Sequence, residues 1–153
     1  MLKALWSDEV PDLVGDHYVL TDAAPLGHPK PVQRPHPPLW LGSSGARYGL
    51  RVVAEYADGW FSAAMPGAGP EGHARISAVL DRHCAEVGRD PATIRRAVQF
   101  PLPPTVGETL RTVAAYRQAG FNDIVLMLTG AGDARITAAD AAAEVLPALR
   151  ELG

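Results

Sequence analysis

Residues 39–47 read Leu-Trp-Leu-Gly-Ser-Ser-Gly-Ala-Arg, and this stretch decides the fold class. A short apolar run at 39–42 leads into a turn of small residues, and apolar residues then recur at helical spacing over 46–56. This is the pattern of a β-strand that passes through a tight turn into an α-helix. If the pattern recurs along the chain, a parallel sheet is expected.

The strand-to-helix pattern occurs four times. Strands are expected at residues 39–42, 59–62, 96–100 and 122–128, and helices at 46–56, 71–87, 106–119 and 137–152. The last strand is apolar on both faces, as in buried parallel strands. Asp90 is expected to cap a short helical segment, and Thr105 to cap the helix at 106–119. Pro147 is expected to kink the final helix. The sequence therefore predicts an α/β fold of four βα units, which form either a small open sheet or half of an eight-stranded barrel.

The first 38 residues follow a different pattern. A helix tail is expected at 2–6 and a short hairpin arm at 15–20, and residues 25–38 contain six prolines in fourteen positions. So dense a proline content predicts an extended, non-helical connecting loop. The chain is thus expected to divide into residues 1–38 and a half-barrel at 39–153, since 153 residues are too few for a complete barrel of roughly 200–250.

Composition and charge exclude several classes of protein. Fourteen basic and seventeen acidic residues give a net charge of −3 without a basic run, which argues against nucleic-acid binding. The sequence contains no apolar stretch of membrane-spanning length, and Cys84 is the single cysteine. We therefore expect a soluble, cytoplasmic protein without a membrane partner or a disulfide. The 12 Arg and 25 Ala against 2 Lys are typical of a GC-rich bacterial genome.

The turn formed by Gly42, Ser43, Ser44 and Gly45 is the strongest candidate site. Its main-chain N–H groups are expected to be unpaired at the start of a helix, where they favour a phosphate. The alternative is a tight βα turn without a ligand, and the motif is neither a P-loop nor a dinucleotide fingerprint. Trp60 either fills the barrel or forms a wall of a cofactor pocket. No residue is assigned as catalytic, and no metal site is predicted.

Two longer stretches carry a resemblance to a known family. Residues 31–45, Pro-Val-Gln-Arg-Pro-His-Pro-Pro-Leu-Trp-Leu-Gly-Ser-Ser-Gly, resemble the luciferase-like monooxygenase family, as do residues 50–60, Leu-Arg-Val-Val-Ala-Glu-Tyr-Ala-Asp-Gly-Trp. Within it, the sequence is most similar to the branch of coenzyme F420-dependent oxidoreductases. Residues 83–91 and 144–147 match as well, so the resemblance covers nearly the whole chain.

The resemblance implies a TIM barrel, of which this chain would be the C-terminal half. It further implies an oxidoreductase that transfers hydride between F420 and a small organic substrate, or an FMN-dependent monooxygenase. Gly42, Ser43, Ser44 and Gly45 match the turn that holds the cofactor phosphate. Trp60, Phe61 and the ends of the third and fourth strands would line the pocket. The family often has glycine at the position of Ser43, and residues 65–70 contain no lysine, so weak cofactor binding is predicted.

A second class of function is compatible with the same residues. The chain could be a non-catalytic, truncated half-barrel or a subunit that requires a partner half. In either case, exposed strand edges would favour a homo-oligomer or pairing with a missing N-terminal half.

Overall fold

The computed structural model describes residues 1–9, 12–62, 68–128, 139 and 141–151. The chain divides into two compact units, Met1–Pro38 and Leu39–Gly153, and each is described by itself. Among the described residues, no helix is both long and apolar enough to cross a bilayer.

The Met1–Pro38 unit contains α1 (Leu2–Trp6), an antiparallel hairpin of β1 (Leu13–Val14) and β2 (Val19–Leu20), and the 3-10 helix η1 (Ala24–Gly27). The helical turn η1 corrects the expectation that residues 25–38 exclude helix. Pro25 lies in its first turn, where a missing N–H removes no hydrogen bond.

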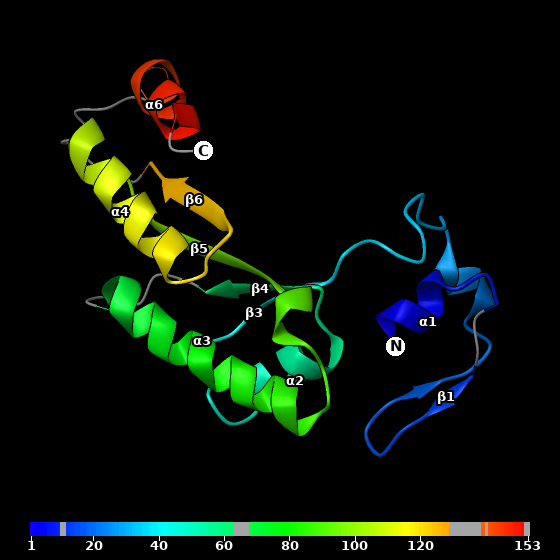
Figure 1. Ribbon diagram of the computed structural model, residues 1–153. Helices are drawn as coiled ribbons and strands as arrows, with labels where there is room; N and C mark the ends of the chain where they lie inside the picture. Colours follow the sequence, from blue (N-terminus) through cyan, green and yellow to red (C-terminus); the bar gives the residue numbers. More distant parts are fainter. Residues whose placement is uncertain (10–11, 63–67, 129–138, 140, 152–153) are drawn as a thin grey trace. The chain divides into compact units, whose positions relative to one another are not determined.

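The Leu39–Gly153 unit is a four-stranded parallel sheet with the strand order β3-β4-β5-β6 (Figure 1). Its elements are, in chain order, β3 (Trp40–Gly42), α2 (Gly49–Tyr56), β4 (Gly59–Ser62), α3 (Gly69–Glu86), η2 (Pro91–Thr93), β5 (Arg95–Pro101), α4 (Val106–Gln118), β6 (Asp123–Met127), the π-helix η3 (Ala141–Val145) and α6 (Leu146–Glu151). The strands lie in the sheet in the same order as in the chain, so each crossover connection joins two neighbouring strands. The predicted α/β class and parallel sheet are confirmed.

Local signals set most of these boundaries. The Asp90 side chain accepts the Ala92 N–H at 2.9 Å, and Thr105 accepts the Glu108 N–H at 3.2 Å, so both predicted caps are present. Gly120 has φ +87, a left-handed conformation that ends α4. The helix expected from residue 46 begins later, at Gly49.

The final helix is only partly described. Thr137 and Leu152, its expected ends, lie outside the described residues. The π-helix η3 gives way to α6 immediately before Pro147, which lacks the N–H that a regular helix interior needs. This irregularity lies where the sequence predicts a kink.

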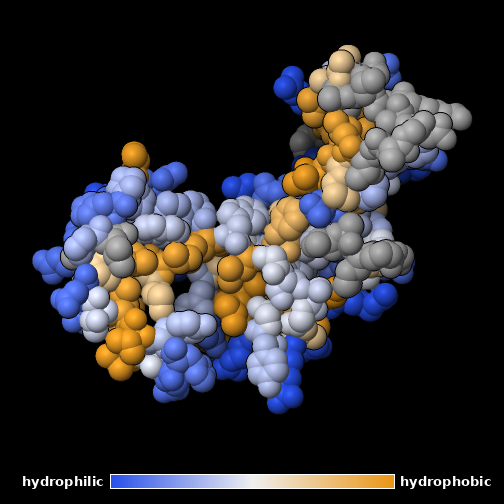
Figure 2. All heavy atoms as spheres, turned by 180° about the vertical axis from the view of Figure 1, so that it is seen from behind, coloured by the Kyte–Doolittle hydropathy of each residue, from blue (hydrophilic) through white to orange (hydrophobic). Residues whose placement is uncertain are grey.

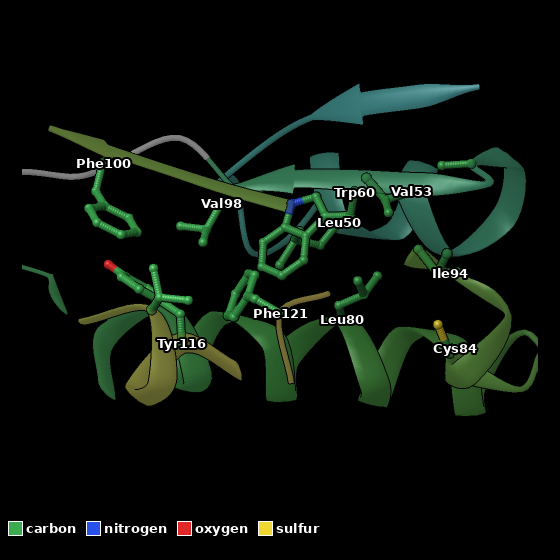
Figure 3. Close-up of a cluster of buried hydrophobic side chains, with 13 residues drawn as sticks. Leu50, Val53, Trp60, Leu80, Cys84, Ile94, Val98, Phe100, Tyr116 and Phe121 are labelled. Atoms are coloured by element: carbon green, nitrogen blue, oxygen red, sulfur yellow. The ribbon is translucent and has the colours of Figure 1, made fainter. Parts of the chain in front are cut away.

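One face of the sheet packs against helices and forms the core (Figure 3). Trp60 lies at 5.8 Å from Phe121 between ring centroids, and Phe100 stacks on Tyr116 at 5.1 Å. The buried cluster consists of Leu50, Val53, Ala54, Ala57, Trp60, Leu80, Cys84, Ile94, Val98, Phe100, Val113, Tyr116 and Phe121. Burial of this apolar surface provides the main driving force for folding.

We call the opposite face of the sheet the open face, because none of the helices described in this unit packs against it (Figure 1). Strand alternation and register place on it Trp40, Phe61, Gln99, Asp123, Val125 and Met127. Val125 is 43% exposed, which corrects the expectation that the last strand is buried on both faces. Apolar side chains reach the surface in several places (Figure 2).

Candidate functional site

The turn after β3 is held together by its own polar groups. The Ser43 hydroxyl accepts the Gly45 N–H at 3.2 Å, and the Gly45 carbonyl accepts the Leu50 N–H at 3.0 Å. The expectation that all four turn residues offer unpaired N–H groups is therefore wrong for Gly45. The serine hydroxyl competes for that donor, as short polar side chains do in turns.

Two side chains from neighbouring elements hold the carbonyls of this turn. The indole Nε1 of Trp60, on β4, donates to the Ser43 carbonyl at 2.8 Å. The Nε2 of His83, on α3, donates to the Ala46 carbonyl at 2.7 Å. A carbonyl can only accept, so Nε2 carries the proton in this contact. The turn is thus attached to both the sheet and a helix.

The remaining donors of the turn suit an anion. In the part of the chain that the structure describes, no hydrogen bond engages the main-chain N–H groups of Ser44, Ala46 or Arg47. All three residues are exposed, and the turn precedes the N-terminus of α2. The Arg47 guanidinium lies 4.9 Å from the Tyr48 ring centroid and adds positive charge. These residues therefore fit a phosphate group.

Trp60 and Phe61 occupy opposite faces of β4. The Trp60 side chain is fully buried in the layer between sheet and helices, so any effect it has on a ligand passes through the Ser43 carbonyl. Phe61 is half-buried on the open face, where it pairs in register with Gly42 and Ala97. Of the two aromatic residues, Phe61 has the orientation to face the interior of a barrel.

Asp58 and Cys84 have structural roles. Asp58 accepts the Leu39 N–H at 2.7 Å through Oδ2, which fixes the chain at the start of β3. Cys84 is buried in the core, and that burial raises the pKa of its thiol. Among the described residues, no group of three or more His, Cys, Asp or Glu side chains could hold a metal ion.

A buried Ser–His pair was missed by sequence reasoning. Ser62 Oγ, at the end of β4, lies 2.9 Å from His73 Nδ1 on α3, and both residues are 1% exposed. The His73 ring meets Tyr116 and Phe121 edge to face at 5.4 and 5.9 Å. Helical spacing from Leu80 and Cys84 could have placed His73 on the buried face of α3. The pair joins the end of a strand to the helix that follows it.

Burial makes His73 a source of acid sensitivity, because desolvation lowers its pKa below the ordinary 6.5. The unfolded chain then binds the proton more tightly than the folded one, so stability falls as the pH drops below 6.5. The loss is expected to approach about 1.4 kcal/mol per pH unit until the folded-state pKa is reached. Urea unfolding at pH 7.5 and at lower pH measures it.

The matched variants are His73→Gln, which removes the buried titratable group, and His17→Gln, which removes an exposed one. His73→Gln is expected to lose less stability on acidification than the wild type. His17→Gln should behave as the wild type does. Equal acid dependence in all three proteins would contradict the role assigned to His73.

Fold and site together define an α/β chain of consecutive βα units with an anion-compatible turn after its first parallel strand. The chain belongs to the luciferase-like monooxygenase family, whose family model matches residues 1–148. The sheet corresponds to half of the TIM barrel of that family. The family predicted from residues 31–45 and 50–60 is thereby confirmed.

Comparison with solved structures agrees with this assignment. Eight chains match, among them an F420-dependent secondary alcohol dehydrogenase in complex with an F420–acetone adduct, at a TM-score of 0.74 and 17% sequence identity. The match covers 97% of this chain but only 58% of the dehydrogenase chain. At this identity the likeness shows a shared fold. No curated protein matches the sequence.

Proposed function

We propose that this chain is the phosphate-binding part of an oxidoreductase that transfers hydride between coenzyme F420 and a small organic substrate. FMN, with monooxygenation, is the alternative cofactor chemistry. The family assignment supports an oxidoreductase, and the dehydrogenase with the same fold is F420-dependent. The observation that carries the proposal is the turn after β3. Its N–H groups at Ser44, Ala46 and Arg47 are engaged by no described residue and fit a phosphate.

The cofactor ring, when bound, supplies the hydride chemistry, and the residues of this chain bind and orient it. Gly42, Ser43, Ser44 and Gly45 form the turn that receives the phosphate, and Arg47 adds a positive charge. Phe61 would offer an apolar surface on the open face. We assign no catalytic acid or base to the described residues.

A second proposal concerns the rest of the site. The chain spans 58% of the dehydrogenase that it resembles, and the open face carries partly exposed apolar residues such as Trp40 and Val125. We infer that catalysis requires further βα units that cover this face, provided by a partner half or by a second copy. By itself the chain would then bind cofactor weakly and turn over no substrate.

The phosphate site is tested most directly with FMN and riboflavin, which differ only in the phosphate. We expect FMN to bind about tenfold or more tightly than riboflavin, because charge-assisted hydrogen bonds to the turn contribute only for FMN. F420 should exceed its phosphate-free deazaflavin in the same way. Flavin and deazaflavin fluorescence titrations give these ratios, even for weak binding. Equal affinities within both pairs would refute the proposed function.

A further inference from the structure

We propose that Trp60 and His83 are positioning residues that aim the N–H groups of the turn after β3 at the cofactor phosphate. This inference rests on the proposed function of the turn. Neither side chain needs to touch the ligand. Each acts through a carbonyl on the turn, Trp60 through that of Ser43 and His83 through that of Ala46.

The geometry of the peptide bond links each held carbonyl to the N–H group that follows it. In a planar trans peptide, the C=O of one residue and the N–H of the next point in opposite directions. Trp60 holds the Ser43 carbonyl toward the core, so the N–H of Ser44 points away from the core. His83 holds the Ala46 carbonyl toward α3, so the N–H of Arg47 points away from that helix. The N–H groups of Ser44 and Arg47 both belong to those that no described residue engages.

Both anchors are themselves fixed. Trp60 is fully buried among core side chains, and its indole N–H has the Ser43 carbonyl as its hydrogen-bond partner. His83 Nδ1 lies 3.1 Å from Glu86 Oε2, and Glu86 also lies 3.7 Å from Arg51 Nη1. Because the buried indole has little freedom to move, this part of the turn is arranged before a ligand arrives, which reduces the ordering required on binding.

The surroundings of Ser43 leave the turn little room to adopt another path. A Cβ at Gly49 would overlap the Ser43 side chain, so the start of α2 packs directly against that serine. The Ser43 hydroxyl in turn holds the Gly45 N–H. Ser43, which replaces the glycine common in the family, thus fits a compact turn. In this turn the Ser43 carbonyl is held by Trp60 and the Ala46 carbonyl by His83.

The experiment uses the full chain and the FMN-to-riboflavin affinity ratio. His83→Leu removes one donor and keeps a side chain of similar size. Trp60→Phe removes the other donor and keeps an aromatic ring in the core. His83→Gln replaces the imidazole but keeps an N–H donor at this position. Ala85→Leu, on an exposed position of α3, is the matched control. Urea unfolding establishes that each variant is folded, and the two single-donor variants test the idea independently.

We expect His83→Leu and Trp60→Phe each to reduce the FMN preference roughly tenfold while the riboflavin affinity stays constant. His83→Gln should recover most of the preference, and Ala85→Leu should retain it. An unchanged ratio in both donor variants, or parallel losses for FMN and riboflavin, would overturn the positioning role. A wild type without any preference for FMN over riboflavin, or for F420 over its phosphate-free deazaflavin, would instead refute the proposed function and the inference with it.

Discussion

Replacing Trp60 with alanine is expected to lower the free energy of unfolding by about 3–5 kcal/mol, the usual range for a buried aromatic residue. The side chain is 0% exposed and packs against Phe121 in the core cluster. Its removal leaves a cavity and also deprives the Ser43 carbonyl of its donor. Because small domains have only about 5–15 kcal/mol of stability, this single change brings the protein close to unfolding.

Trp40 provides the matched control, since it lies on the adjacent strand but on the open face and is 39% exposed. Trp40→Ala is expected to cost clearly less than Trp60→Ala. Urea unfolding followed by circular dichroism measures both without depending on the tryptophan signal. Equal losses would contradict the assignment of the two indoles to opposite faces of the sheet.

Self-association of the isolated chain is the second large effect that we expect. In the described part of the chain, β3 and β6 form the two ends of the sheet, and Val125 on β6 is 43% exposed on the open face. Unpaired strand edges and exposed apolar residues favour pairing with a second sheet. Sedimentation velocity over a range of concentrations should therefore show dimers or larger species.

Val125→Lys is expected to weaken this association about tenfold or more, because a charged side chain on an edge strand opposes pairing. Val52→Lys is the control, since Val52 is 46% exposed but lies on α2. The control should associate as the wild type does. A wild-type chain that stays monomeric at every concentration, or equal effects of the two substitutions, would contradict an interface on the open face.

Local sequence signals account for most of the secondary structure. Asp90 and Thr105 were recognisable as caps because a cap depends on the few residues that follow it. The strand at 59–62 has the predicted bounds because its apolar run is short and small residues flank it in the sequence. The start of α2 was harder to predict from the sequence, because the turn before Gly49 is shaped partly by a side chain from α3.

The arrangement of the candidate site depended on contacts that no local pattern reports. Ser43 and Trp60 are 17 residues apart, and Ala46 and His83 are 37 apart. The motif at residues 42–45 indicated a phosphate turn, but which N–H groups remain available was decided by these two anchors. Strand alternation puts neighbours such as Trp60 and Phe61 on opposite faces, but it does not show which face the helices cover.

The sequence by itself determined the order of strands and helices, the family, and the turn that is the candidate phosphate site, because each of these follows from residues close together in the chain. Only the tertiary structure decided that Trp60 belongs to the core, that Ser62 and His73 are joined, and that Trp60 and His83 hold the carbonyls of Ser43 and Ala46. The physical reason is that these outcomes arise when helices and sheet pack together. Burial and hydrogen bonding then depend on partners distant in sequence.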